Sequence, residues 1–450
     1  MEHCSRIHVT VGIVGGGIAG LSLARMLELS GISYCLWEAH SQFSPPAGAS
    51  IGLMPNGLRI LDQIGMIDKI NEYNVKRKAW EHRDERGNLR AKFNSGVIFE
   101  EKYRPLGYGG VFVERQRVLD IMHESIEDKT RLHTSKRVVS VLQTKQEAVI
   151  ISEDGSEIGC DFVAGADGVR SIVRSEIAKT AATDKNLEWR FDARYACIYG
   201  ISDPVPGVEP GQSFTVYRPD VSLLIFCGYG GDIYWFVNHD LKRTVPYERP
   251  ERFSEQDIEA VYAHVADTIV TDGVVFADIF QNRRAAIMAA LEEGVLDQFF
   301  SGRLFVLGDS AHKMVPHAAM GANQALESAA AFVNSLRPFL SRRSNYCPSI
   351  SIPQSGVESC LTQYDLRRRA RVTTAFQIAN LTCRAQLMIG PAGKEYCSNL
   401  PKMMSAAGTE KLLESFCNAE VLENWSIGSS RVALYTAFAE AKANQSIPRL

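Results

Sequence analysis

The chain has 450 residues, a formal net charge of −3 and 45% hydrophobic residues, which is the composition of an ordinary globular protein of two or three domains. A general nucleic-acid binder is normally more basic, and no stretch approaches the ~20 apolar residues of a membrane span, so we expect neither a nucleic-acid partner nor stable membrane insertion. The ten scattered cysteines include no Cys-x-x-Cys pair, and the first residues lack a signal-peptide pattern. We therefore expect a cytoplasmic protein with reduced thiols and no metal site.

The first predicted elements form a βαβ unit. Residues 9–14 are a β-branched run that predicts a buried parallel strand. Residues 18–27 carry apolar side chains at helical spacing and stop before Gly31, and residues 33–38 predict a second strand. A glycine-rich turn between a strand and a helix is the setting in which dinucleotides bind.

Gly15, Gly17 and Gly20 give that turn the pattern G-x-G-x-x-G. The first glycine permits a tight turn, the second lets the backbone approach a pyrophosphate, and the third allows close packing of helix on strand. The helix N-terminus then offers free N–H groups to phosphate. Glu38, at the end of the second strand, can accept hydrogen bonds from ribose hydroxyls and would repel a 2′-phosphate, which favours FAD or NAD over NADP here.

A second glycine segment follows a mixed stretch of short elements. Before it, the pattern predicts helices at 55–64 and 115–126, a charged hairpin tip at 81–88, and strands at 138–142, 148–151 and 161–164. The segment itself reads Gly-Ala-Asp-Gly-Val-Arg-Ser, with Asp167 at its centre. In isolation Asp167 is as consistent with an N-capping turn as with a ligand site, and Arg115 with a surface cation.

Short strands dominate from about residue 187 to residue 295 and predict an antiparallel sheet. They are expected at 195–201, 212–217, 223–229 and 233–238. A buried strand at 303–307 then precedes a helix at 324–340, a Ser/Pro/Arg-rich linker at 341–359 and a mostly helical C-terminal part that includes a helix at 364–388.

Asp309 stands in the third glycine segment, Gly-Asp-Ser-Ala-His, between that strand and helix. A carboxylate there can bind ribityl-type hydroxyls. The turn that follows, with Gly321 and Ala322, places backbone N–H groups near a helix start, where they suit the anionic end of a reduced isoalloxazine. His312 is expected to shape the turn rather than to transfer protons.

Taken in order, the three segments resemble single-component, FAD-dependent aromatic-hydroxylase-type (group A) monooxygenases. The residues Gly48–Gly57, Leu61-Asp62-Gln63 and Gly308–Met314 resemble the fungal secondary-metabolite branch, which includes paxilline- and meroterpenoid-type epoxidases and monooxygenases of prenylated indole alkaloids. The resemblance implies an α/β fold with a Rossmann-like FAD-binding domain, an antiparallel-sheet substrate domain and a C-terminal helical region, as in para-hydroxybenzoate hydroxylase. The implied boundaries are 1–75, 105–185 and 296–340 for the FAD-binding domain, 76–104 and 186–295 for the substrate-binding sheet domain, and 360–450 for the helical region.

The same resemblance implies roles for single residues. The family's FAD contacts match Glu38, Gly52, Arg115, Asp309 and Ala322. The Asp167 segment matches one that serves both FAD and a visiting NADPH or NADH. Arg194 matches a position that faces the flavin, and we expect it to stabilise developing charge; Tyr229 is a second catalytic candidate. One departure is Ala319, which replaces a glycine of the family's flavin loop.

The function implied is insertion of one oxygen atom from O2, through a flavin C4a-hydroperoxide formed at the expense of NAD(P)H. Such transfer needs a water-poor pocket, for which Phe226, Tyr229, Trp235 and Phe236 are candidate lining residues, although plain core packing also explains them. The substrate expected is a small polycyclic molecule, in the first place the indole of a prenylated alkaloid, which 2,3-epoxidation and semipinacol rearrangement convert to a spiro-oxindole.

Other functions stay open from the sequence. They are epoxidation of a meroterpenoid or indole-diterpene polyprenyl chain, aromatic hydroxylation, and nucleotide sensing without oxygenation. A flavin halogenase is disfavoured because no two tryptophans stand two apart, and an amine oxidase because residues 42–52 lack an Arg-x-Gly-Gly-Arg segment. The sequence indicates no particular oligomeric state.

Overall fold

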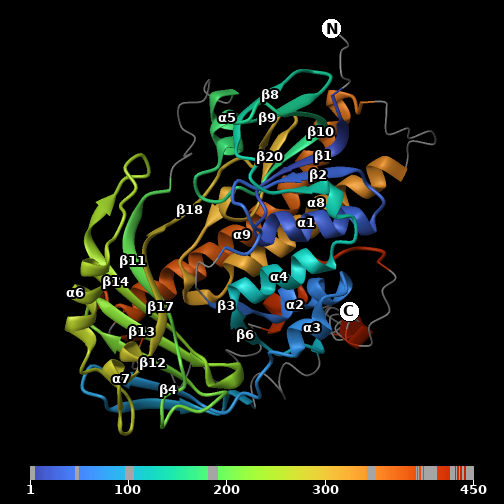
Figure 1. Cartoon of the computed structure of the whole chain (residues 1–450). Coiled ribbons are helices and arrows are strands. Elements are labelled where there is room, and N and C mark those ends of the chain that lie inside the picture. Colours follow the sequence, from blue (N-terminus) through green and yellow to red (C-terminus); the bar gives the residue numbers. More distant parts are fainter. Residues whose placement is uncertain are drawn as a thin grey trace.

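A computed structural model (Figure 1) describes residues 6–45, 50–96, 106–180, 191–341, 351–391 and 413–425, with scattered positions between 393 and 441. The helices are α1 (Ile18–Leu29), α2 (Pro55–Gln63), α3 (Ile67–Asn71), α4 (Arg115–Ser125), α5 (Ile172–Thr180), α6 (Glu255–Val265), α7 (Phe276–Gln281), α8 (Gly321–Ser341) and α9 (Gln354–Gln386). Short 3-10 turns include η4 (Tyr229–Gly231), η5 (Gly308–Ser310) and η6 (Pro316–Ala318).

The strands fall into two main sheets and three small ladders. Those of the first sheet are β1 (His8–Val14), β2 (Tyr34–Trp37), β7 (Leu132–His133), β8 (Val138–Gln143), β9 (Ala148–Ser152), β10 (Glu157–Gly165), β19 (Phe300–Ser301) and β20 (Leu304–Val306). Those of the second are β4 (Trp80–Asp84), β5 (Leu89–Phe93), β11 (Ala193–Ser202), β12 (Ser213–Arg218), β13 (Val221–Cys227), β14 (Ile233–Val245) and β17 (Arg283–Glu292). The ladders pair β3 (Ser50–Leu53) with β6 (Val111–Glu114), β15 (Ile269–Thr271) with β16 (Val274–Val275), and β18 (Gly294–Val295) with β21 (His312–Lys313).

The first sheet has a parallel centre in the order β20-β10-β1-β2-β7. β1 and β10 are buried along nearly their whole length, because strands inside a parallel sheet are covered on both faces and read as continuous apolar runs. The β8–β9 hairpin adds antiparallel to β10. The α/β fold expected from the sequence is confirmed, and the three glycine segments follow β1, β10 and β20 at one edge of the sheet.

The second sheet has the order β17-β11-β14-β13-β12-β4-β5 and is antiparallel except where β4 runs parallel to β12. One face packs on α6 and α7, and the other faces α9 and the first sheet. β4 and β5 come from an early part of the chain, although the rest of the sheet follows residue 190. The hairpin predicted at 81–88 is present, but Glu81–Asp84 belong to β4 and have buried side chains, so its tip is shorter than expected.

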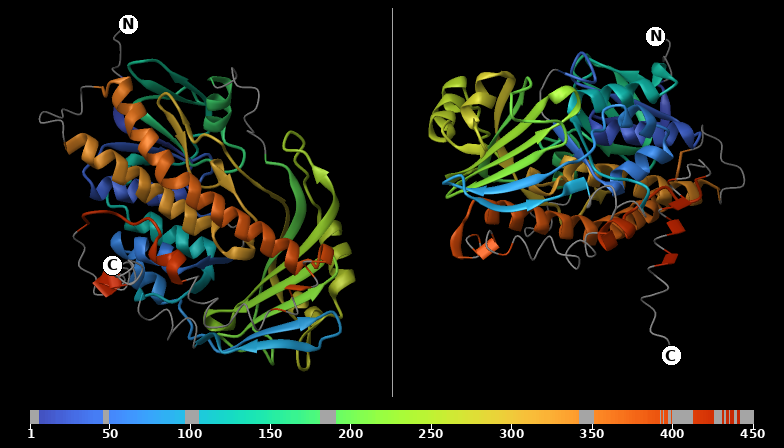
Figure 2. Two further views of the ribbon diagram at one scale, coloured as in Figure 1. Left: turned by 180° about the vertical axis from the view of Figure 1, so that it is seen from behind. Right: turned by 90° about the horizontal axis from the view of Figure 1, so that it is seen from below.

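Two long helices connect the sheets. α8 packs against α1, α2 and α9, and α9 continues past the first sheet to lie across the second (Figure 2). α9 already begins at Gln354, so the linker predicted at 341–359 ends earlier than expected. Because α9 crosses from one sheet to the other, we expect residues of its inner face to line any cavity between the two sheets.

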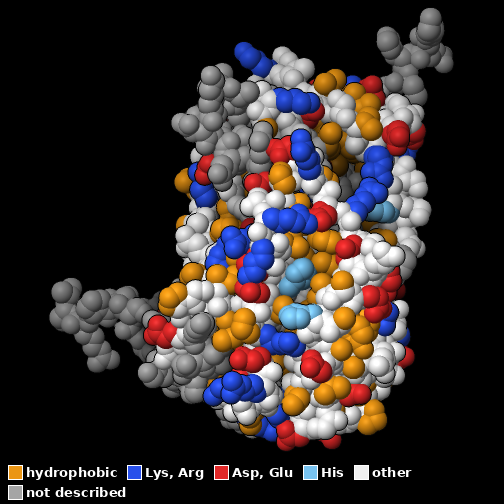
Figure 3. All heavy atoms as spheres, turned by 90° about the vertical axis from the view of Figure 1, so that its left-hand side faces the viewer, with side chains coloured by type: hydrophobic (Ala, Val, Ile, Leu, Met, Phe, Trp, Pro, Cys, Tyr) orange, Lys and Arg blue, Asp and Glu red, His pale blue; other side chains and the backbone are white. Residues whose placement is uncertain are grey.

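The described part of the chain contains no helix that combines the length and the apolar character needed to cross a membrane. Among the same residues, no cluster of His, Cys, Asp or Glu is arranged to hold a metal ion. On the face shown in Figure 3, Lys and Arg side chains stand interspersed with Asp and Glu rather than in one continuous basic patch. Mixed charge of this kind matches the small net charge of the chain.

Candidate active site

A cavity of about 900 Å³ lies between the carboxyl ends of the parallel strands and the inner face of the second sheet. Open α/β sheets bind their ligands at these strand ends. Residues that follow β1, β2, β10 and β20 line one end of the cavity, and aromatic residues of the second sheet line the other. We call these the nucleotide end and the sheet end.

The three glycines of the first motif have different surroundings. Gly15 has φ of +100°, and a Cβ there would lie 2.5 Å from the carbonyl oxygen of Ala166. A Cβ at Gly20 would lie 1.9 Å from the Gly15 oxygen, and Gly20 does not line the cavity. Gly17 lines the cavity, and a Cβ there would meet no protein atom within 4 Å. Gly15 and Gly20 therefore serve the packing of strand and helix, and Gly17 keeps space open toward a ligand.

Helix α1 begins at this open space without a side-chain cap. Its N-cap residue is Gly17, and its first turn holds no acidic residue. Free N–H groups and the positive end of the helix dipole therefore face the cavity. Gly168 and Gly321 line the same cavity and likewise leave the place of a Cβ free of protein atoms. This uncapped, glycine-lined cradle fits the pyrophosphate and neighbouring groups of a dinucleotide.

Glu38 follows β2 at the rim of the cradle, where its side chain is 12% exposed. Its Oε2 accepts a 2.6 Å hydrogen bond from the Gly16 N–H, and its Oε1 accepts one of 2.8 Å from the His40 N–H. These bonds hold the carboxylate beside the glycine turn. A carboxylate so placed can accept further hydrogen bonds from paired ribose hydroxyls.

Asp167, in the second motif, also lines the cavity. Its Oδ2 accepts a 2.8 Å hydrogen bond from the Ile172 N–H at the start of α5, and its Oδ1 accepts one of 3.2 Å from the Ser310 hydroxyl. Burial raises the pKa of Asp167, although hydrogen bonds from Ser171 and from the Ile172 N–H oppose this shift. Asp167 thus holds the first N–H of α5, while Ser171, the residue before the helix, caps it by accepting from the Arg174 N–H at 3.0 Å. Arg174, on α5, is buried and donates to the Ser310 carbonyl at 3.1 Å, which ties the second motif to the third.

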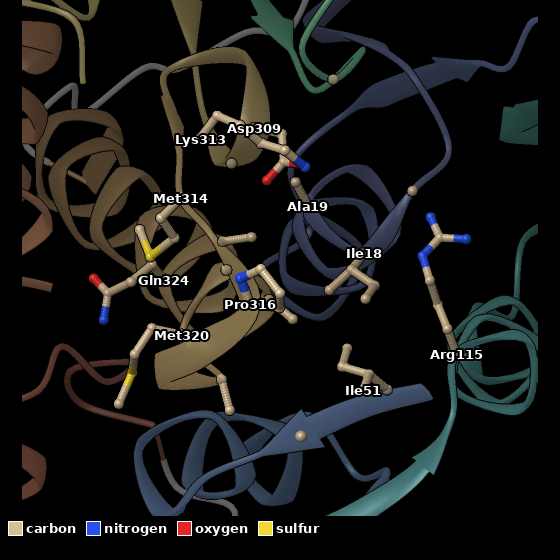
Figure 4. Close-up of a pocket in the computed structure, with 18 of the residues that line it drawn as sticks. Ile18, Ala19, Ile51, Arg115, Asp309, Lys313, Met314, Pro316, Met320 and Gln324 are labelled. Atoms are coloured by element: carbon tan, nitrogen blue, oxygen red, sulfur yellow. The ribbon is translucent and has the colours of Figure 1, made fainter. Parts of the chain in front are cut away.

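Three further charged residues lie at the nucleotide end: Asp309, Lys313 and Arg115. Figure 4 shows Asp309 beside Lys313 on one side of the cavity and Arg115 on the other. Burial raises the pKa of Asp309, but its ion pair with Lys313 and the nearby Arg115 outweigh this and hold it below the ordinary value. Burial lowers the pKa of Arg115, opposed by Asp309 and Glu38. Asp309 therefore stays an acceptor for hydroxyl groups, and Arg115 remains a cation for phosphate.

The loop before α8 completes this end of the cavity. Gly52, Gly321 and Ala322 all line it. Asn323 donates to the Gly52 carbonyl at 2.9 Å, and its Oδ1 accepts from the Met54 N–H at 3.0 Å, which fixes β3 against the loop. Ala319 has φ of +51°, which lies in the left-handed region that a glycine, unlike an alanine, adopts without strain. The backbone at Ala319 therefore has a conformation that suits glycine and is strained for an alanine.

Two histidines of the third motif region are neutral. His312 is fully buried, and its Nε2 lies 3.2 Å from the Ser328 hydroxyl. Burial lowers the pKa of His312 to about 3, and burial lowers that of His317 to a similar value. His312 therefore packs beneath the turn, as expected, whereas His317 lines the cavity.

The structure does not bring the two predicted catalytic residues into the cavity. Arg194 has a side chain that is 52% exposed, and its Nη2 donates to Asp240 at 3.2 Å. Its neighbour Tyr195 points the opposite way, into the apolar cluster under α9. Tyr229 lies in η4, is 51% exposed and packs edge-on against Tyr73. The expectation that Arg194 faces the flavin is therefore wrong for this structure, and Tyr229 has no geometric support as a catalytic group.

Strand alternation decides which aromatic residues form the sheet end. Phe226 and Phe236 line the cavity as expected. Trp235 points to the other face of β14, where it packs against Phe276 and Phe280, so it is not a lining residue. Lining residues that the sequence interpretation missed are Trp80, Phe112, Tyr199 and Leu224.

A parallel α/β sheet with an uncapped, glycine-lined cradle at its strand ends defines a dinucleotide-binding oxidoreductase, here with an aromatic chamber beside the cofactor cradle. Residues 8–348 match the family model described as FAD binding domain. The FAD-dependent monooxygenase ausM of Aspergillus calidoustus is 35% identical over 84% of this chain and 80% of its own length, and penM of Penicillium crustosum is 32% identical over 84% and 79%.

Solved structures agree on the fold. HpxO of Klebsiella pneumoniae, complexed with FAD and uric acid, superposes with a TM-score of 0.73 at 19% identity over 91% of this chain and 97% of that one. CtdE, complexed with FAD and a substrate, gives a TM-score of 0.69 at 19% identity over 97% and 99%. This chain belongs to the FAD binding domain family and is an FAD-dependent monooxygenase, with NAD(P)H as electron donor. The family resemblance drawn from the three motifs is confirmed.

Proposed function

We propose that this monooxygenase oxygenates the indole of a neutral, prenylated polycyclic alkaloid at its 2,3 double bond, and that the product rearranges by a semipinacol shift to a spiro-oxindole. The observation that carries the proposal is the sheet end of the cavity, which is aromatic and contains no charged side chain of the second sheet. Such a chamber favours a flat, electron-rich and uncharged ring system.

Different residues of the nucleotide end would bind different parts of FAD. Glu38 would hold the adenosine ribose, the start of α1 with Gly17 the pyrophosphate, Asp309 the ribityl hydroxyls, and the start of α8 with Ala322 the ring. Bound FAD, reduced by NAD(P)H, supplies an electrophilic oxygen atom derived from O2. Asp167 and Arg170 also line the cavity and would meet the visiting nicotinamide nucleotide.

Exclusion of water is the task of the sheet end. Phe112 and Phe226 stack with ring centroids 3.9 Å apart, and Tyr199 packs edge-on against Phe236 at 5.6 Å. Phe226 and Phe236 are less than a tenth exposed. A dry chamber protects the activated oxygen from loss as hydrogen peroxide and directs it to the substrate.

Charge at the sheet end also supports a neutral substrate. Among the described α9 residues that line the cavity, the charged one is Arg371, whose Nε and Nη2 donate to Glu327 at 2.6 and 3.0 Å. Arg371 is thereby paired inside the protein with Glu327, which it shares with Arg368. A carboxylate substrate would find no free cation on the described lining of the second sheet.

In the proposed reaction one atom of O2 adds across the indole double bond, and the other leaves as water with two electrons from NAD(P)H and two protons. Opening of the epoxide and migration of one substituent then give the oxindole carbonyl without a further oxidant. Epoxidation of a polyprenyl chain and hydroxylation of an aromatic ring remain the competing outcomes.

The test is an assay of the purified, FAD-loaded protein under ¹⁸O2 with a prenylated indole alkaloid and, separately, a prenylated quinone, each with NADPH and with NADH. We expect substrate-triggered oxidation of the nicotinamide and one ¹⁸O atom in an oxindole product. The protein without substrate is the control for peroxide leakage. Preferential consumption of the quinone would overturn the choice of substrate.

A further inference from the structure

Two buried carboxamides at the sheet end have atoms without a hydrogen-bond partner. Asn238 is fully buried and lines the cavity, yet neither its Nδ2 nor its Oδ1 has a partner. Gln386, at the end of α9, is 6% exposed and lines the same cavity, and its Oε1 also has none. Folded proteins rarely leave buried polar atoms unpaired, because the lost hydration is not recovered.

The two side chains belong to the same end of the chamber. Asn238 of β14 stands directly opposite Cys197 of β11. Cys197 and Cys383 of α9 lie in one apolar cluster, and Gln386 follows Cys383 by about one helical turn.

A backbone hydrogen bond fixes the same proximity from the other side. The Asp220 N–H donates to the Leu387 carbonyl at 2.9 Å, which anchors the end of α9 beside the start of β13. On β13, Ser222 stands opposite Asn238. Sheet and helix thus bring the two amides to one wall of the cavity.

The sheet surface changes character along its strands. From the Ser222–Asn238 pair, the next inward pair is Leu224–Phe236, and Phe226 lies two residues further along β13. Four residues of strand span about 13 Å, so the unpaired amide stands about 13 Å along the wall from the stacked Phe112–Phe226 rings, a separation that only a ligand of several fused rings can bridge. A ligand that used both would be a polycycle with a polar group at one end.

We propose that Asn238 and Gln386 form a subsite that binds a ring lactam of the substrate. A primary amide offers an N–H donor and a C=O acceptor side by side, which complements the carbonyl and N–H of a cyclic secondary amide. A charged partner does not fit, because the wall holds no counter-charge. This inference rests on the proposed function and narrows it: the electron-rich ring lies toward Phe226 and the lactam toward Asn238.

The test measures binding rather than turnover. Two probes are titrated into the FAD-loaded enzyme, and the change in the flavin absorbance spectrum gives each Kd. The first is an indole-fused six-membered lactam; the second is the corresponding lactone, in which a ring oxygen replaces the N–H. The wild type is expected to bind the lactam at least about tenfold more tightly, because the lactone leaves a buried acceptor unpaired.

Variants then test whether the preference for the lactam comes from hydrogen bonding by the amides or from the shape of the cavity wall. Asn238→Leu is expected to bring the two Kd values within about twofold of each other, and Gln386→Leu to reduce the preference. Leu224→Met, the matched control, changes the same wall without a polar group and should keep the preference. Asn238→Leu should fold, since it replaces an unpaired polar group by an apolar one; Asn238→Ser provides a second variant with the same expected loss of preference.

Equal affinity of the wild type for the two probes would overturn the proposal, as would a preference that survives in both the Asn238 and the Gln386 variants. A loss of affinity for both probes to the same extent would show a structural role and would also overturn it. Failure of the proposed function is distinguishable, because oxygen incorporation is assayed separately and the lactam preference needs no turnover.

Discussion

The two ends of the cavity are built in opposite ways. At the nucleotide end the three carboxylates are each held by a partner: Glu38 by backbone N–H groups, Asp309 by Lys313, and Asp167 by the start of α5. At the sheet end the residues of the second sheet are mostly aromatic and carry no charge, and the side chain of Asn238 has no hydrogen-bond partner. The protein itself thus fixes the carboxylates of the nucleotide end. At the sheet end, by contrast, the unpaired amide is left to form its hydrogen bonds with a ligand. Substitutions should therefore act on folding at one end and on selectivity at the other.

The largest effect is expected at Glu327, the buried anion of α8 that holds the helices around the cavity. It accepts hydrogen bonds from Arg368, Arg371 and Asn56, and Arg368 is fully buried with it. Glu327→Gln leaves two arginines without their counter-charge, so we expect a loss of about 3–5 kcal/mol in the free energy of unfolding. Urea unfolding measures it, with exposed Glu72→Gln as control. A loss below about 1 kcal/mol would show that the network is dispensable.

The pH dependence of that effect has a defined sign. Burial raises the pKa of Glu327, but Arg368 and Arg371 outweigh this and lower it to about 2, against 4.5 as the ordinary value. Because the folded-state pKa is depressed, the stabilisation is fully present above pH 4.5 and is lost as the pH falls toward 2. The difference between wild type and Glu327→Gln should therefore shrink when unfolding is measured in acid.

The next prediction separates folding from cofactor binding within one motif. Gly15→Ala places a Cβ 2.5 Å from a backbone oxygen at a positive φ, and should cost about 2 kcal/mol or more. Gly17→Ala meets no protein atom, so the apoprotein should keep its thermal stability while FAD retention falls, because the methyl group occupies the cradle. Thermal unfolding of apoprotein and the flavin-to-protein absorbance ratio measure the two effects. Full retention of FAD by Gly17→Ala would remove Gly17 from the site.

A smaller effect is expected at Ala319, where the chain departs from its relatives. A left-handed conformation costs an alanine roughly 1–2 kcal/mol, part of which glycine returns through its flexible unfolded state. Ala319→Gly should therefore stabilise the protein by about 0.5–1 kcal/mol, seen as a higher Tm. Ser135→Gly, at another left-handed position whose own side chain does not line the cavity, provides the comparison. A lower Tm would mean that the Ala319 methyl, which packs close to Gly52, contributes more than its strain costs.

The sequence was sufficient wherever local backbone geometry carries the site. Gly17, Glu38, Asp309 and Ala322 line the cavity because strand–turn–helix segments place them there whatever the rest of the chain does. The network around Glu327 joins three helices far apart in the chain, and no local pattern contains such pairings.

The direction of side chains in the second sheet could be predicted only in part from the sequence. Trp235 and Phe236 are neighbours on one strand and must point to opposite faces, so both could not line one cavity. The same rule separates Arg194 from Tyr195. The sequence could not show which face of the sheet lines the cavity, because that depends on where α9 crosses the sheet. Nor could it show the register shift between Ala193 and Tyr195 on β11.

The smallest effect is expected at Arg194. Its partner Asp240 also accepts a 2.8 Å hydrogen bond from the Lys242 N–H and pairs with the Lys242 ammonium at 3.5 Å, so it keeps a counter-charge when Arg194 is removed. Arg194→Ala should therefore change the free energy of unfolding by less than about 1 kcal/mol, because Arg194 is half exposed and the buried Asp240 keeps its other partners. Coupled turnover should stay close to that of the wild type, whereas Tyr199→Ala, which opens the chamber wall, should increase peroxide release. If Arg194→Ala instead abolished coupled turnover with FAD still bound, Arg194 would have to reach the chamber in a conformation other than this one, and the sheet end would be completed only when substrate enters.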